Sequence, residues 1–273
     1  DDGFYYDHLL VDGKSIPIRI RSLVGLMPLL SGVLLEDQIT ANLPGFTRRT
    51  EWFLRYNPKL ADKMTCMRCT ESRSGMPGTR LLALPSEERF ERLLRVMFDE
   101  SEFLSPFGIR SMSAIHREKP FVFEFGGQRN TVQYVPGESD SGMFGGNSNW
   151  RGPVWFPMNF LLIQALKRYH KFYGDEYLVE YPTGSGNKMN LSEIAGDLEQ
   201  RLVRLFMPDA NGRRPAHGTD DIYATDPRWK DLVLFYEYFH GDNGRGLGAS
   251  HQTGWTALVA NMLDAIARRK DDV

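Results

Sequence analysis

The residue best suited to acid–base chemistry is Glu237, which stands between Tyr236 and Tyr238. Four glycines follow within the next eleven residues, and glycine allows the backbone to approach a side chain closely. A carboxylate among aromatic rings can serve as a general base, because its surroundings set its pKa and its position. The same pattern also fits a solvated glutamate at the edge of a loop, so the spacing alone leaves both interpretations open.

Two tryptophan-containing segments, at 150–155 and 251–255, carry groups that suit a sugar. Tryptophan faces stack on the C–H faces of sugar rings, and the arginine fork donates to hydroxyls or carboxylates. Trp155 equally suits a core anchor for the helix expected after it. The candidate sugar contacts in these segments and in the preceding loops are Trp150, Arg151, Trp155, Tyr236, Gln252, Trp255, Arg110 and Phe144.

Other site chemistries find less support in the residue spacing. The histidines lack the His-Glu-x-x-His spacing of a zinc site, so we expect no metal. The glycines at 244, 246 and 248 lack the strand–turn–helix context of a dinucleotide fingerprint, so we expect no cofactor. The remaining loop carboxylates are expected to be solvated or to cap turns: Glu138, Asp140, Asp220 and Asp221.

Composition narrows the class of protein. The 273 residues carry a net charge of −2 without a basic stripe, which disfavours nucleic acid as a partner. No apolar run reaches the roughly 18 residues of a membrane span. Cys66 and Cys69 have no second pair, so we interpret them as incidental thiols of a reducing compartment and expect a cytoplasmic protein. Oligomeric state is not indicated.

Helical periodicity dominates the elements that must position the site. Apolar residues recur at helical spacing over 20–30, 52–56, 90–97, 155–173, 191–205 and 255–266. Asn190 and Pro208 mark the start and stop of the fifth helix, and Pro153 suits the first turn of the fourth. Strand-like runs at 121–125 and 131–135 flank Gly126-Gly127, which predicts a hairpin.

These elements favour an all-α fold. No series of sheet-forming segments is visible, and the long loops at 99–150 and 208–254 are expected to gather at one end of a helical frame. A helical toroid is the natural candidate, because each predicted helix has one or two apolar faces.

The order of motifs along the chain resembles the C-terminal domain of glycoside hydrolase family 63. That family includes the processing α-glucosidase I of the secretory pathway and many bacterial proteins, of which the large bacterial members look closer. The blocks Trp-Arg-Gly-Pro-Val-Trp at 150–155 and His-Gln-Thr-Gly-Trp-Thr at 251–256 are specific together. The segments that carry the resemblance are 2–7, 21–26, 102–105, 108–111, 134–139, 145–155, 239–242 and 251–256.

The resemblance implies an (α/α)6 toroid that hydrolyses an α-linked glucoside or oligosaccharide with inversion. The family's general base is a glutamate on the loop shortly before the Thr-Gly-Trp helix, and Glu237 matches that position. Its general acid is an aspartate upstream of the Phe-Tyr-Tyr-Asp segment, and no residue here matches it. We therefore expect residues 1–273 to be the C-terminal part of a single (α/α)6 catalytic domain, with the N-terminal part missing, and to be inactive alone.

Two alternatives stay open. A sugar epimerase or lyase on a related toroid would use His251 or His240 to carry protons in place of Glu237. A non-catalytic carbohydrate-binding domain would use the same tryptophans and tyrosines without turnover.

Overall fold

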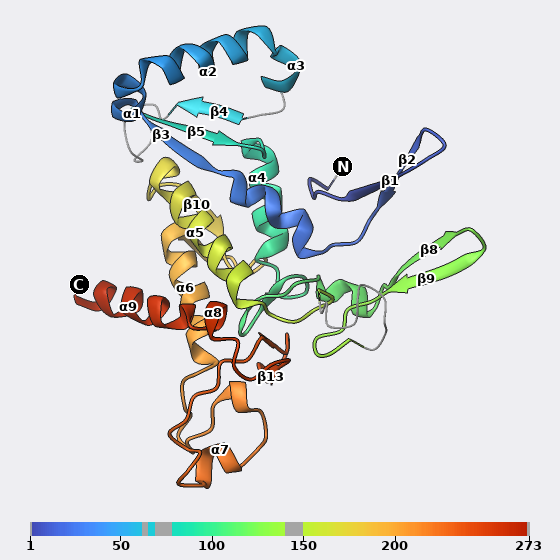
Figure 1. The fold of residues 1–273 in the computed structure, drawn as a ribbon, viewed down its shortest axis with the longest axis vertical. Coiled ribbons are helices and arrows are strands. Elements are labelled where there is room, and N and C mark those ends of the chain that lie inside the picture. Colours follow the sequence, from blue (N-terminus) through green and yellow to red (C-terminus); the bar gives the residue numbers. More distant parts are fainter. Residues whose placement is uncertain (1, 62–64, 69–77, 140–149, 272–273) are drawn as a thin grey trace.

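The computed structural model of the chain describes residues 2–61, 65–68, 78–139 and 150–271. Helices form the centre of the molecule, and two antiparallel hairpins, at 7–18 and 121–132, project from it (Figure 1). The helices are α1 (Asp37–Asn42), α2 (Pro44–Tyr56), α3 (Pro58–Ala61), α4 (Glu87–Met97), α5 (Phe156–Tyr173), α6 (Leu191–Arg204), α7 (Ile222–Thr225), α8 (Thr253–Thr256) and α9 (Leu258–Asp271), with the 3-10 helices η1 (Leu23–Ser31), η2 (Ala114–Arg117) and η3 (Pro215–His217).

The strands are short and pair mostly as hairpins. The two-stranded pairs are β1 (Asp7–Val11) with β2 (Lys14–Ile18), β6 (Leu104–Ser105) with β7 (Gly108–Ile109), β8 (Phe121–Phe125) with β9 (Gln128–Val132), β10 (Leu178–Glu180) with β11 (Lys188–Asn190), and β12 (Tyr238–Phe239) with β13 (Gly246–Leu247). β3 (Val33–Glu36), β5 (Thr79–Ala83) and β4 (Thr65–Arg68) form a three-stranded sheet in that order.

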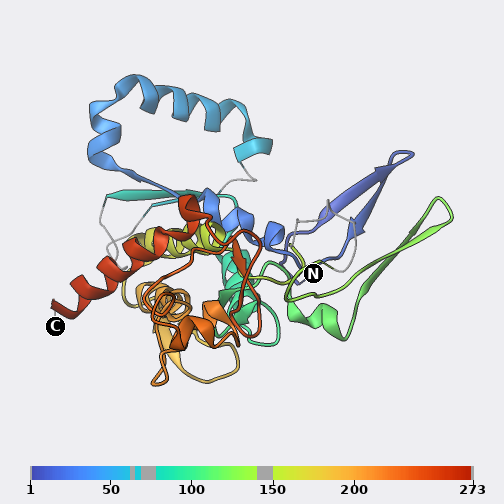
Figure 2. The ribbon, with the colours of Figure 1, turned by 60° about the horizontal axis from the view of Figure 1, so that its bottom comes forward.

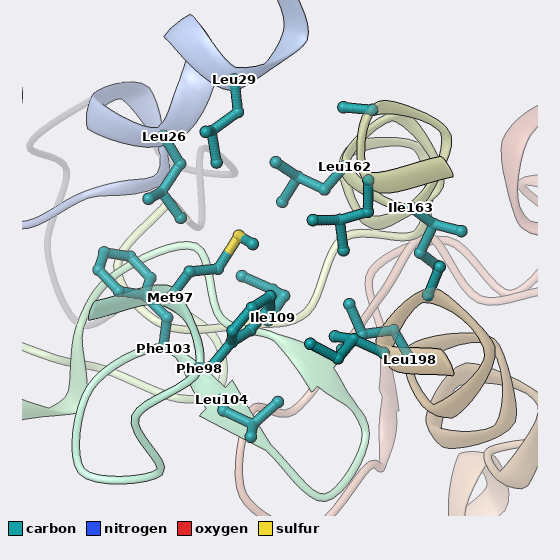
Figure 3. Close-up of a cluster of buried hydrophobic side chains, with 14 of the residues drawn as sticks. Leu26, Leu29, Met97, Phe98, Phe103, Leu104, Ile109, Leu162, Ile163 and Leu198 are labelled. Atoms are coloured by element: carbon teal, nitrogen blue, oxygen red, sulfur yellow. The ribbon is translucent and has the colours of Figure 1, made fainter. Parts of the chain in front are cut away.

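The apolar core lies where η1, α4, α5 and α6 meet. Leu162 and Ile163 of α5 lie beside Leu198 of α6, and Leu26 of η1 and Met97 of α4 close the other side (Figure 3). Among these five side chains the largest exposed fraction is 2%, so they supply the close-packed apolar burial that holds the frame together.

A buried carboxylate adds a polar contact between three helices. Glu199 of α6 is 1% exposed and forms ion pairs with Lys167 of α5 and Arg269 of α9. A buried carboxylate is tolerated only when it is paired and hydrogen-bonded, and here both oxygens accept. This triad therefore fixes the position of α9 against α5 and α6.

The helix boundaries agree with most of the sequence predictions. Asn190 is the N-cap of α6 in a capping box with Glu193, and α6 ends at Arg204, before Pro208. The prediction for Pro153 was wrong, because α5 begins at Phe156 and places Pro157 in its first turn. Pro153 instead precedes Val154, which lies in an extended bridge between Arg110 and Phe239.

The strands show one correct prediction and one wrong one. The hairpin at Gly126-Gly127 is confirmed, although its second strand begins at Gln128 because both glycines have positive φ and close a two-residue turn. The prediction that the chain has no sheet-forming series was wrong, since β3, β5 and β4 form a sheet. β3 and β5 lie more than forty residues apart in the sequence, so local periodicity could not reveal their pairing.

Two further findings concern only the described part of the chain. Cys66 lies in β4, whereas Cys69 lies outside the described residues. None of the described helices combines the length and the apolar character needed to cross a membrane.

Candidate active site

Hydrogen bonds hold the segment around Glu237 against the start of the last helices. The backbone N–H of Glu237 donates to the Ala249 carbonyl at 2.9 Å, and that of Gln252 donates to the Phe235 carbonyl at 2.7 Å. The indole N–H of Trp255 donates to the Glu237 carbonyl at 3.1 Å. These bonds come from both sides of the segment, so the backbone at Glu237 is fixed relative to Trp255.

The Glu237 carboxylate is itself held in place. The side chain is half-buried, and its Oε2 accepts a hydrogen bond from the Ala249 N–H at 3.2 Å. Gly248 lies so near that a Cβ added to it would stand 2.6 Å from Oε2. Only a glycine fits there, and the backbone donor beside it orients the carboxylate.

Aromatic rings from three segments form a cluster beside Glu237. The Trp155 ring stacks on Trp150 with centroids 5.2 Å apart and on Tyr238 at 4.7 Å, and Trp255 meets it edge-on at 5.9 Å. Trp155 is 6% exposed, whereas Trp150 is 37% exposed. Trp155 is thus enclosed by other rings and anchors the cluster, while Trp150 keeps surface available to a ligand.

Tyr236 points into the protein on another side of the segment. Its ring packs against Gly246, where an added Cβ would lie 2.1 Å from the ring carbon Cδ2. Burial first, and then the neighbouring Tyr223, raise the pKa of Tyr236 to about 12, so its hydroxyl stays protonated. Gln252 is half-buried and is the N-cap residue of α8 without a side-chain capping bond. Phe144 lies outside the described residues.

The two candidate arginines are engaged by the protein. Arg151 is 4% exposed and donates to the Ser139 hydroxyl at 2.6 Å. Arg110 is 7% exposed and donates to the Leu104 carbonyl at 2.6 Å and to the Tyr134 hydroxyl at 3.1 Å. Both guanidinium groups therefore stabilise the loops around the cluster through hydrogen bonds.

Sequence reasoning did not identify the group that completes the Arg110 network. Asp242 accepts from the Tyr134 hydroxyl at 2.8 Å and from Arg117 at 2.6 Å, and Arg110 lies 3.4 Å from it. The Arg117 guanidinium also lies over the Tyr134 ring, 4.8 Å from its centroid. Tyr134 and Asp242 both fall in the motif segments quoted above, but segments so far apart give no sign that they meet.

His240 has a structural role in the turn that carries Asp242. Its Nδ1 lies 3.2 Å and 3.3 Å from the backbone nitrogens of Asp242 and Asn243, which donate to it. Nδ1 must then be unprotonated, which places the proton of the neutral ring on Nε2. Burial, with help from Arg117 and Arg245 and against the effect of Asp242, lowers the pKa of His240. This arrangement favours a structural role for His240, in which its neutral ring holds the turn, and disfavours a role in proton transfer.

We expect the free energy of unfolding to fall as the pH falls below about 6.5, the ordinary histidine pKa. Burial and the nearby Arg214 lower the pKa of His217, and burial also lowers the pKa of His240. The folded state therefore binds protons at these two rings less readily than the unfolded chain does. The contribution of these two histidines to the free energy of unfolding is therefore fully present above their pKa in the unfolded chain. It is lost as the pH falls through their lowered pKa values in the folded state. Urea unfolding between about pH 7.5 and pH 5 measures the effect.

His217→Phe should reduce this pH dependence. Neither ring nitrogen of His217 has a hydrogen-bond partner among the described residues, so the substitution removes a buried group that must not be charged. His8→Phe, at an exposed position, is the control. An unchanged pH dependence in His217→Phe would show that other groups cause it.

No group of three or more His, Cys, Asp or Glu side chains that could hold a metal ion occurs among the residues the structure describes. The described part of the site combines one oriented carboxylate, an aromatic cluster and two buried arginines.

Comparison with known proteins finds relatives that match most of the chain. The chain is 47% identical to the uncharacterized protein YMR196W of Saccharomyces cerevisiae over 267 residues, which is 97% of this chain and 24% of that protein. It is 26% identical to the probable mannosyl-oligosaccharide glucosidase of Schizosaccharomyces pombe, over 66% of this chain and 16% of the relative. The mannosyl-oligosaccharide glucosidase of S. cerevisiae matches at 25% identity over 70% of the chain and 17% of the relative. The chain thus spans about a quarter or less of the length of these relatives.

A family match covers the whole candidate site. Residues 79–256 match the family described as the mannosylglycerate hydrolase MGH1-like glycoside hydrolase domain, and this range contains Glu237 and every candidate sugar contact. The match and the two glucosidase relatives confirm the predicted resemblance to glycoside hydrolase family 63. The chain therefore belongs to the mannosylglycerate hydrolase MGH1-like glycoside hydrolase family.

Proposed function

We propose that this domain hydrolyses an α-linked glucoside with inversion, and that Glu237 is the general base. The observation that carries the proposal is the fixed position of Glu237, whose carboxylate accepts from the Ala249 N–H and whose backbone carbonyl accepts from the Trp255 indole. The choice of a glucoside rests on the two relatives whose names describe glucosidases of mannosyl-oligosaccharides.

In the proposed reaction Glu237 takes a proton from water while the water oxygen attacks the anomeric carbon. The glycosidic bond breaks, and the leaving oxygen receives a proton from a carboxylic acid on the opposite face of the sugar. Within the described part of the chain Oε1 of Glu237 has no hydrogen-bond donor, so this oxygen is available to the water. Inversion requires the two carboxyl groups to stand about 6.5–9.5 Å apart, which leaves room for the water.

The general acid is proposed to be an aspartate from outside residues 1–273. The described helices are proposed to form part of an (α/α)6 toroid, in which the loops around Glu237 and Trp150 gather at one end. The family membership and the helical core support this arrangement.

The stereochemistry of the first product tests the proposal. A protein that contains this domain together with its acid is mixed with an α-glucoside, and proton NMR follows the anomeric signals before mutarotation equilibrates them. We expect the β-anomer of glucose to appear first, because water attacks from the face opposite the leaving group. If the α-anomer appears first, the reaction retains configuration and Glu237 is not an inverting base.

The same experiment separates the other candidate functions. An epimerase or lyase would convert the sugar without releasing glucose from a glycosidic bond. A carbohydrate-binding domain would retain the sugar and release no product. The hydrogen bonds that His240 accepts from the backbone favour hydrolysis by Glu237 over an epimerase that uses His240.

A further inference from the structure

A buried histidine lies beside the segment that carries Glu237. His217, the last residue of η3, is 5% exposed, and neither of its ring nitrogens has a hydrogen-bond partner among the described residues. The orange segment that carries η3 and α7 lies next to the red segment that carries β13 in both views (Figures 1 and 2), and η3 contacts β13. An imidazole buried in this way costs more free energy than an apolar ring of similar shape, so its presence calls for a role other than packing.

The His217 ring contacts two tyrosine rings. Its centroid lies 4.4 Å from that of Tyr223 in α7, and it meets the Tyr236 ring edge-on at 6.5 Å. Trp229 meets the Tyr223 ring edge-on at 5.6 Å and helps to hold it. The Tyr236 ring also packs against Gly246. A neutral imidazole at position 217 therefore completes a cluster of rings that encloses Tyr236.

The position of Tyr236 determines that of the candidate base through the backbone. Tyr236 directly precedes Glu237, and the carbonyls of both residues accept hydrogen bonds from side chains of α8. The Tyr236 carbonyl accepts from the Thr256 hydroxyl at 2.6 Å, and the Glu237 carbonyl accepts from the Trp255 indole N–H at 3.1 Å. A displacement of the Tyr236 ring therefore changes these two bonds and moves the Glu237 carboxylate.

Protonation of His217 is the change that disturbs this cluster. A charged imidazole needs an acceptor at each nitrogen, and within the described residues neither nitrogen has one. The titratable and charged groups on the elements around it are Arg214 at the N-cap of η3, Asp220 after η3, Tyr223 of α7, Tyr236 before β12 and Arg245, whose Cγ would stand 3.0 Å from a Cβ added at Gly218. Of these groups only Arg214 acts on the pKa of His217, and it lowers that pKa by its like charge. A charged His217 ring therefore has no compensating partner and must move toward water.

We propose that His217 is a positioning residue for Glu237: its neutral ring supports Tyr236, and its protonation withdraws this support and slows turnover. The proposal rests on the proposed function, because it concerns the position of the general base. It also accounts for the imidazole, since a phenyl ring would fill the same space but would not respond to pH.

The Trp255 indole reports the position of the Glu237 segment without any turnover. In the full chain labelled with 5-fluorotryptophan, the signal of Trp255 among the five tryptophans is identified by its loss in Trp255→Phe and followed by fluorine NMR. We expect this signal to shift as the pH falls from about 7.5 to about 5, with a midpoint below about 6.5, because burial and then Arg214 lower the pKa of His217. His217→Phe cannot be charged and should lose this shift.

Two controls accompany the titration. His8→Phe removes an exposed histidine and should keep the shift of the Trp255 signal. An unchanged far-ultraviolet circular dichroism spectrum over the same pH range shows that the chain stays folded.

Turnover tests the consequence for the base. In a protein that contains this domain and its acid, kcat for an α-glucoside should be on the order of ten-fold lower at about pH 5.5 than at about pH 7.5, because a displaced base slows the attack. KM should change little, since His217 acts on the base and not on the sugar. In His217→Phe most of this difference in kcat should disappear. His217→Gln, which is also uncharged, is the second variant if the first does not fold.

The outcomes separate this role from the proposed function. If the Trp255 signal shifts alike in the wild type and in His217→Phe, His217 does not act on the Glu237 segment and the proposal is wrong. If the signal responds to His217 but both proteins lose kcat alike as the pH falls, His217 does not position the base, and the proposal is again wrong. If the signal responds and the glucoside is not hydrolysed at any pH, the proposed function fails together with the role of His217 in turnover, while the structural link between His217 and Glu237 stands.

Discussion

Glu237→Gln is expected to lower kcat for an α-glucoside by about 10²- to 10⁴-fold, the range that general acid–base catalysis contributes. Glutamine has the shape of glutamate and can still accept from the Ala249 N–H through its carbonyl oxygen. It cannot take a proton from water, so the sugar should bind nearly as well while the attack becomes slow. The measurement is kcat and KM in a protein that contains this domain and its acid.

The control for this substitution is Glu124→Gln. Glu124 lies in β8 with its side chain 74% exposed, in the hairpin that projects from the molecule (Figure 1). The Glu124→Gln substitution also removes one negative charge, but at a position outside the site, so kcat should stay unchanged. Activity that survives Glu237→Gln but is lost in His251→Ala would favour the epimerase and would exclude Glu237 as the base.

The helices of this fold were largely predictable, because their apolar residues repeat at the spacing that packs one face of a helix. The run from Trp155 to Tyr173 predicts α5 in this way, and Asn190 predicts the start of α6 through its capping chemistry. The three-stranded sheet was not predictable from the same signal. Its strands β3 and β5 are short apolar runs, and they pair with each other across more than forty residues of sequence.

The candidate site shows the same division between local and non-local information. Residue type and a close run of glycines single out Glu237, and the structure sets it beside Trp255. The enclosed position of Trp155 depends on Tyr238, which comes from another segment and stacks on it. The hydrogen bonds of Asp242 likewise join Arg110, Arg117 and Tyr134, more than a hundred residues earlier in the chain. Such contacts follow from the fold and could not be derived from spacing.

Gly248→Ala should lower both activity and stability, for two separable reasons. Gly248 has φ +69°, a conformation that costs a residue with a Cβ about 1–2 kcal/mol. The new methyl group would also stand 2.6 Å from Oε2 of Glu237 and 2.7 Å from Cε1 of Tyr238, so the carboxylate must move. Since a displacement of about 1 Å can cost 10²-fold in rate, we expect kcat to fall by about 10- to 100-fold.

Gly186→Ala separates the two effects, because Gly186 has φ +78° and a Cβ there would meet no atom within 4 Å. This variant carries the conformational cost alone, so its free energy of unfolding should fall by about 1–2 kcal/mol while kcat stays unchanged. Gly248→Ala should lose at least as much stability in urea unfolding, together with most of its activity. If Gly248→Ala lost stability only, as Gly186→Ala does, the position of the carboxylate beside Gly248 would have no part in turnover, because catalysis would then tolerate its displacement.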